Sequence, residues 1–168
     1  MEPRGIRNNN PLNIRVGKSK WQGQSNYLTP PGKGGATGVF RGTTECGSGP
    51  TKGSESPFVT EEGGESTFCQ FYSMEYGIRA AFCLLRTYAT KYRLNCVKDI
   101  ITRWAPPSEN DTQSYIRHVC LLTGFGGNQR LTEKDWPRLV KAMAKMESGI
   151  ELDNEIIEKG FKLYKNER

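Results

Sequence analysis

The chain has 168 residues, of which 35% are hydrophobic and 25% are charged, and its formal net charge is +6. This length suits a single domain with a hydrophobic core, and no apolar run is long enough for a membrane-spanning helix. The basic balance favours an anionic partner, such as nucleic acid or a bacterial wall. The opening residues, MEPRGIRNNN, lack the apolar segment of a secretory signal peptide, so we expect synthesis in the cytoplasm.

The cysteines and the histidine restrict the chemistry further. Five cysteines without a C-x-x-C pair and a single histidine fit neither a disulfide framework nor a zinc cluster. We therefore expect reduced thiols, with a Cys46–Cys69 bridge as the alternative. No metal and no cofactor is predicted.

Residues 1–72 are predicted to form a lobe of loops and short strands, because they contain 13 of the 19 glycines. The segment RGIRNNNPLNIR (4–15) reads as neither helix nor strand. Asparagine tolerates the left-handed backbone and caps its own turns, so NNNP predicts a rigid turn with amides on its outer side. GGATGVFRG and STFCQFY could pair as a hairpin around a long polar turn.

Residues 73–168 are predicted to be helical, with five amphipathic segments separated by caps and breakers. The first begins after Ser73, the second after Asn95 and ends before Pro106-Pro107, and the third covers Thr112 to Thr123 before Gly124. The fourth follows Thr132 and ends at Ser148-Gly149, and the last follows Asp153. The predicted inward positions are Ile78, Ala81, Phe82, Leu85 and Tyr88 or Ala89; Val97, Ile100, Ile101 and Trp104; Tyr115, Ile116, Val119 and Leu122; and Ile156, Ile157, Phe161 and Tyr164. The fold class is mainly α (α+β), with a small β-hairpin or loop lobe.

A carboxylate ends the apolar stripe of the fourth helix. Trp136, Val140, Met143 and Glu147 follow one another at i, i+4, i+7 and i+11, which is one helix face. Partial burial and the negative end of the helix dipole would both raise the pKa of Glu147. A carboxyl that keeps its proton near neutral pH suits general-acid attack on a glycosidic oxygen. The alternative is a glutamate at the edge of the stripe that reaches water beside Lys145.

Several stretches resemble the lysozyme-like peptidoglycan-hydrolase superfamily, and especially phage virion lysis proteins with an RGIRNNNP motif. They are RGIRNNNPLNIR, WQGQ, FCQFYSMEYGIRAAFCLLRTY, IITRWAPPSENDTQSYI and LVKAMAKMESG, in collinear order over most of the chain. The segment from about Asn26 to Thr67 is longer than the family pattern. The resemblance implies a single lysozyme-like domain, 1–168, with a loop or β lobe (1–72) and a helical lobe (73–168).

The chain also resembles bacterial β-N-acetylglucosaminidases and lytic transglycosylases of that superfamily, in a rotated order. Their helical Glu-Ser-Gly comes first, whereas Glu147-Ser148-Gly149 follows the Asn9-Asn10 turn and Trp21-Gln22-Gly23 here. Such a circular permutation implies that Glu147 stands beside the asparagine turn in space.

The resemblance implies a catalytic Glu147 and a set of substrate-binding residues. The implied binding residues are Asn9, Asn10, Asn13, Trp21, Tyr115 and Ser148, with Tyr115 orienting an N-acetyl group. Glu109 is the candidate second carboxylate, with Asp111, Glu45 and Glu65 as alternatives. A hydrolase usually needs such a second group, whereas one acid/base suffices for lytic transglycosylation, so the sequence leaves muramidase and transglycosylase outcomes open.

Three rival functions remain open at this point. One is a wall peptidase, for which Cys96 near a helix N-terminus, with a lowered thiol pKa, could pair with His118. Another is a non-catalytic module that binds wall or virion, and the third is a nucleic-acid binder, although no known reader motif is present. We expect peptidoglycan as the partner, action in the periplasm or cell wall, and delivery by a virion, a secretion apparatus or a pore, with a cognate immunity protein as a further candidate partner.

Overall fold

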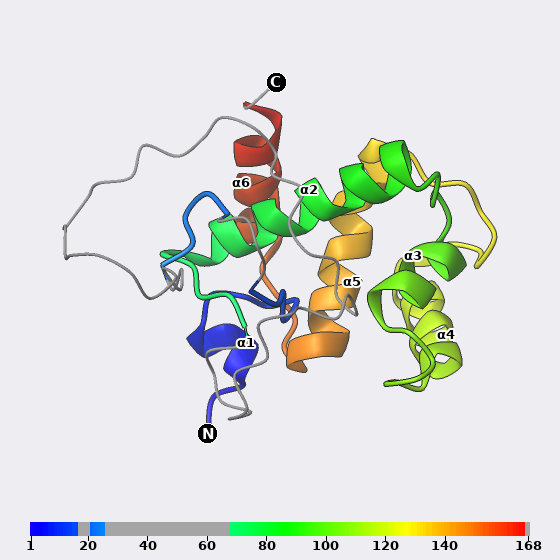
Figure 1. The fold of residues 1–168 in the computed structure, drawn as a ribbon, viewed down its shortest axis with the longest axis horizontal. Coiled ribbons are helices and arrows are strands. Elements are labelled where there is room, and N and C mark those ends of the chain that lie inside the picture. The colour runs from blue at the N-terminus through cyan, green and yellow to red at the C-terminus, as the bar shows by residue number, and fades with distance from the viewer. Residues whose placement is uncertain (17–20, 26–67, 167–168) are drawn as a thin grey trace, which may run out of the picture.

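The computed structural model describes residues 1–16, 21–25 and 68–166, and it is mainly α-helical (Figure 1). The helices are α1 (Arg4–Arg7), α2 (Met74–Lys91), α3 (Val97–Trp104), α4 (Thr112–Thr123), α5 (Trp136–Ser148) and α6 (Asn154–Lys165), with a 3₁₀ turn, η2 (Glu133–Asp135), before α5. The predicted fold class is therefore confirmed. In the described segments, no helix is both long and apolar enough to cross a membrane.

The predicted helix boundaries agree with these elements at most ends, but Thr132 caps the 3₁₀ turn η2, and α5 begins only after Asp135. Ser73 precedes α2, Asp111 caps α4 by accepting from the Ser114 N–H, and Asp153 caps α6 by accepting from Glu155. The left-handed residues Gly124 and Gly149 end α4 and α5 as expected. The second helix begins one residue late: Cys96 is its N-cap, and the Asn95 amide donates to the carbonyl of Arg93.

Two expectations about helices are wrong. The segment 4–15 does contain a helix, the single turn α1, whose carbonyl at Gly5 accepts from the N–H of Asn10 at 2.7 Å. Leu122 is 44% exposed and not inward, and Thr123 is buried in its place, with its hydroxyl bonded to the Val119 carbonyl. The other predicted inward residues are buried, except Ala89, Ile156 and Phe161, which are half-buried at the core's edge.

Helix α2 is the centre of the molecule, and in Figure 1 it crosses the middle of the structure with α5 and α6 against it. Every residue from Gly77 to Leu85 is buried. Phe82 packs edge-on against Phe161 of α6, with ring centroids 4.9 Å apart. Leu12, Ile14 and Trp21 join the same hydrophobic cluster, so the described N-terminal residues and the helices share one core.

Most of the predicted hairpin, namely its first arm and its turn, lies outside the described residues. The described end of its second arm pairs with the N-terminal segment, through isolated antiparallel bridges from Phe68 to Arg15 and from Phe71 to Gln24. This pairing brings the asparagine turn down onto the start of α2.

Gly77 fixes how closely the asparagine turn approaches α2. A Cβ atom at this position would lie 2.1 Å from the carbonyl oxygen of Asn9 and 3.3 Å from the Cδ of Pro11. Only glycine leaves room for backbone against helix at this distance. This contact fixes the distance between the asparagine turn and α2.

Candidate active site

Glu147 lies in the last turn of α5, at the end of the predicted apolar stripe. Trp136, Val140 and Met143 are 6%, 0% and 0% exposed, whereas Glu147 is half-buried. The stripe is therefore confirmed, and its carboxylate lies at the boundary between the core and the surface.

Three donors from three other parts of the chain converge on this carboxylate. The indole N–H of Trp104, at the end of α3, and the hydroxyl of Tyr115, in α4, both donate to Oε1 at 3.2 Å. The side-chain amide of Asn13 donates to Oε2 at 3.2 Å and to the Glu147 backbone carbonyl at 3.3 Å. The expected meeting of Glu147 with the asparagine turn is thus present in the structure.

Asn13 owes its position to the conformation of the turn. Asn9 and Asn13 both have left-handed backbone, with φ of 51° and 50°, which asparagine accepts more readily than most residues. The buried Asn10 amide donates to the carbonyls of Ile14 and Cys69 at 2.8 and 2.9 Å and accepts from the Ile14 N–H. Asn10 therefore holds the turn together, and Asn13 projects from it towards Glu147.

The donors have fixed protonation states. The indole N–H can only donate. Burial, followed by the negative charge of Glu147 and the hydrogen bond to it, raises the pKa of Tyr115 well above its ordinary value. Both of these groups donate to Oε1, whereas the Asn13 amide donates to Oε2.

Four of the predicted substrate-binding residues have structural roles. Asn10, Trp21 and Ser148 are only 1%, 3% and 6% exposed. The Ser148 hydroxyl donates to the Ala144 carbonyl, and the Asn9 amide donates to the Phe71 carbonyl at 3.0 Å. Asn10, Trp21 and Ser148 are therefore buried, and the Asn9 amide is bonded to backbone, whereas Asn13 and Tyr115 contact Glu147.

Glu109 lies on the turn between α3 and α4, where it meets Arg15 from the N-terminal segment. The Arg15 guanidinium and the Glu109 carboxylate are 3.5 Å apart, and their side chains are 37% and 48% exposed. An exposed pair at this distance contributes little to stability, about 0–1 kcal/mol. Glu109 is thus available to other partners, on a segment that joins the two helices bearing Trp104 and Tyr115.

Trp104 is the site residue that sequence reasoning missed. The helical pattern assigned it to the core, and it is indeed 0% exposed, but its N–H reaches Glu147. A buried tryptophan usually has a hydrogen-bond partner for this N–H. The glutamate at the end of the apolar stripe of the fourth helix was the sequence feature that could have indicated this partner.

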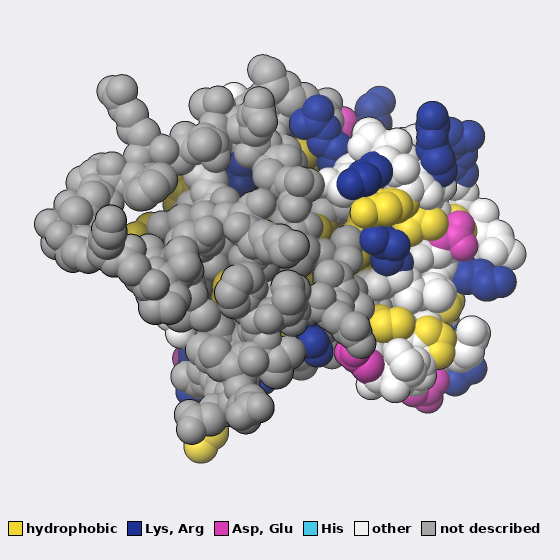
Figure 2. All heavy atoms as spheres, viewed as in Figure 1, with side chains coloured by type: hydrophobic (Ala, Val, Ile, Leu, Met, Phe, Trp, Pro, Cys, Tyr) yellow, Lys and Arg dark blue, Asp and Glu magenta, His cyan; other side chains and the backbone are white. Residues whose placement is uncertain are grey.

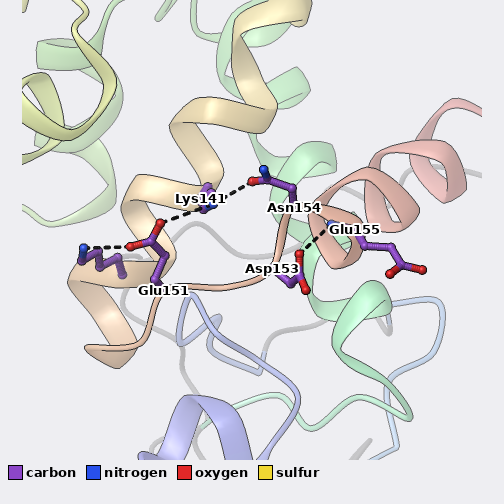
Figure 3. A network of polar contacts seen from close by, with 6 residues as sticks. Lys141, Glu151, Asp153, Asn154 and Glu155 are labelled. Carbon is purple, nitrogen blue, oxygen red and sulfur yellow. Dashed lines mark hydrogen bonds and ion pairs between the residues drawn. The ribbon is translucent and has the colours of Figure 1, made fainter.

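The turn that follows Glu147 is held by ion pairs (Figure 3). Lys145 and Lys141 of α5 reach Glu151 at 3.1 and 3.4 Å, and Lys141 also donates to Asn154 at 2.7 Å. The hydrogen bond and charge of Lys145, and then those of Lys141, lower the pKa of Glu151. This network ties the end of α5 to the start of α6, beside the candidate acid.

The cysteines differ from expectation in two ways. Cys83 is disulfide-bonded, so the expectation of reduced thiols is wrong there, whereas Cys69, Cys96 and Cys120 are free thiols. Since Cys69 is free, the alternative Cys46–Cys69 bridge is also wrong. Burial raises the pKa of the Cys96 thiol instead of lowering it. Among the described residues, no group of three or more His, Cys, Asp or Glu side chains could hold a metal ion.

The chain is similar to a phage protein. Protein P5 of Pseudoalteromonas phage PM2 is 36% identical to this chain over 149 residues, which are 87% of this chain and 71% of that protein. The chain belongs to the P5 family. No family model matches it. The matched part spans most of both chains.

Proposed function

We propose that the chain cleaves the glycan strand of peptidoglycan, with Glu147 as the general acid. The observation that carries this proposal is the half-buried carboxyl of Glu147, oriented by donors from Asn13, Trp104 and Tyr115. Placing one carboxyl with three fixed partners from distant segments costs conformational entropy, and it is what an oriented proton donor requires. The resemblance to lysozyme-like phage lysis proteins supports the same assignment.

In the proposed reaction, the proton leaves Oε2 for the glycosidic oxygen as positive charge develops at the anomeric carbon. Trp104 and Tyr115 stabilise the resulting carboxylate through Oε1. The Asn13 amide, which now contacts Oε2, would turn towards the substrate and is free to bond a hydroxyl or N-acetyl group.

The fate of the glycosyl cation depends on a second group. A carboxylate about 5–5.5 Å away would act as a nucleophile, and one about 6.5–9.5 Å away would activate water. Glu109 is our candidate for this role, once released from Arg15. Without such a group, the 6-hydroxyl of muramic acid closes on the anomeric carbon, and the reaction is a lytic transglycosylation.

Mass spectrometry of purified sacculi after digestion tests the proposal directly. Anhydromuramic ends indicate transglycosylation, and new reducing ends indicate hydrolysis. Free stem peptides without glycan cleavage would contradict the proposal and favour the peptidase alternative.

Tyr115→Phe tests the orientation of the acid. The substitution removes one donor to Oε1 and keeps the packed ring, so we expect kcat on peptidoglycan to fall about tenfold, as for one hydrogen bond to a charged group. KM should change little, because Oε1 faces the protein. The measurement is turnover of soluble glycan fragments at several concentrations. A rise in KM with unchanged kcat would instead assign Tyr115 to substrate binding.

Cys96→Ser tests the thiol peptidase. The raised thiol pKa and the engagement of His118 with the Ser114 carbonyl at 2.7 Å both oppose a Cys96–His118 pair. We therefore expect wall lysis by the variant to equal that of the parent protein in a turbidity assay. Loss of lysis with retained folding would reverse this conclusion.

We further propose delivery of the protein to the wall by a virion, which the phage origin of Protein P5 supports.

The nucleic-acid alternative is tested by a gel shift at moderate salt, because phosphate-driven binding weakens steeply as salt rises. A shift that persists there would count against a wall substrate.

A further inference from the structure

A polar hollow lies at the opposite end of α3 from Trp104. It forms where the loop between α2 and α3 runs beside the loop between α4 and η2. The Leu131 N–H donates to the Asn95 carbonyl at 2.7 Å, and the backbone N–H of Lys98 donates to the Gly127 carbonyl at 2.9 Å. The hollow has a volume of about 410 Å³ and is lined by Arg93, Asn95, Cys96, Asp99, Asn128 and Arg130. This size is within the range of small-ligand sites.

The charge of the hollow is positive. Arg93 comes from one loop and Arg130 from the other, and Asp99 is the one carboxylate of the lining. In the described part of the chain, neither arginine forms an ion pair, with Asp99 or with any other acid. Figure 2 shows further Lys and Arg side chains over the right-hand part of the molecule, where α2 ends in Figure 1.

The backbone holds Arg93 in an unusual conformation. Its φ is 59°, in the left-handed region, which costs most non-glycine residues about 1–2 kcal/mol. The Asn95 amide donates to the Arg93 carbonyl at 3.3 Å, and the antiparallel bridge between Cys96 and Arg130 fixes the facing loop. The backbone at Arg93 and at Arg130 is therefore held in place, and both side chains line the hollow from neighbouring loops.

We propose that this hollow binds a phosphate group carried by a sugar or polyol. The planar guanidinium groups suit the oxygens of phosphate, and they have no competing partner among the described residues. The amides of Asn95 and Asn128 and the carboxylate of Asp99 can bond the hydroxyl groups of the carrier. The N-terminus of α3, capped by Cys96, adds a favourable dipole for an anion.

The inference does not depend on the function proposed for Glu147. The hollow and the Glu147 site lie at opposite ends of α3, which has eight residues and a length of about 12 Å. A phosphorylated polymer bound in the hollow would be anchored beside the glycan site without entering it.

The test is a titration of the whole chain, followed by the amide resonances of residues 93–99 and 126–131. The probes are inorganic phosphate, glucose 6-phosphate and glucose, with chloride at equal ionic strength as reference. We expect saturable shifts with phosphate and tighter binding of glucose 6-phosphate. Arg93→Asn, which keeps a residue suited to positive φ, and Arg130→Gln should each weaken phosphate binding about tenfold.

Two variants serve as controls for charge. Arg117→Gln removes one positive charge from the exposed face of α4 and should leave the phosphate affinity unchanged, whereas Asp99→Asn should raise it. Shifts no larger than those with chloride, or an equal loss of affinity in Arg117→Gln, would overturn the site. Equal affinities for phosphate and glucose 6-phosphate would overturn the sugar or polyol part of the proposal. The catalytic proposal would survive any of these results.

Discussion

Glu147→Gln is expected to lower turnover of peptidoglycan by about 10²–10⁴-fold, the range for loss of a general acid. The glutamine amide cannot deliver the proton, but its carbonyl can still accept from Trp104 and Tyr115. The Asn13 side chain can rotate so that its carbonyl accepts from the glutamine NH₂ group. Folding and wall binding should therefore be retained. Turbidity of sacculi, pelleting with sacculi and thermal unfolding measure the three quantities.

The matched control is Glu158→Gln, which makes the same chemical change at an exposed position of α6. It should leave turnover, wall binding and unfolding temperature unaltered. If Glu147→Gln lyses the wall at the parent rate, the carboxyl is not the proton donor, and a role as binding module or another active centre must replace the proposal.

Gly77→Ala is expected to destabilise the protein, against the usual preference of helices. Helix propensity alone predicts a gain of about 1 kcal/mol for this change within a helix. The new Cβ would however lie 2.1 Å from the Asn9 carbonyl oxygen, which is backbone and cannot simply rotate away. We expect a net loss of about 1–3 kcal/mol in the free energy of unfolding, as for overpacked sites.

The same variant should also lose activity, because lifting the asparagine turn moves Asn13 away from Glu147. Denaturant unfolding and turnover of the remaining folded protein separate the two effects. Gly127→Ala is the control: its Cβ would meet only the Cys120 sulfur, at 4.0 Å. If the Gly77→Ala protein is more stable than its parent, the asparagine turn can move away from the new Cβ without a loss of folding free energy, and the prediction is wrong.

The sequence predicted the helices well because their apolar positions recur at helical spacing between clear caps. The single turn α1 could not be predicted, since Arg-Gly-Ile-Arg has no such spacing and its conformation depends on the contact of Gly5 with Asn10. Leu122 failed for a different reason: the apolar stripe of α4 ends at Val119, and Thr123 satisfies its hydroxyl within the helix.

The candidate site was predicted only in part. Spacing identified Glu147, and the resemblance connected it with the asparagine turn. The run of three asparagines does not, however, indicate which side-chain amide is buried. Asn10 is 1% exposed and bonded to backbone on both sides, whereas Asn13 reaches across to the acid. That distinction depends on packing against Cys69 and α2, which becomes visible only in three dimensions.

The contact between Asn13 and Glu147 joins positions 134 residues apart. During translation, Glu147 is made after Asn13, Trp104 and Tyr115. Pairing across such a separation also forms slowly, because a long segment of chain must close first. The hydrogen bonds that would orient the proposed acid therefore form only after α5 has been made, and a product truncated before Glu147 would lack all of them.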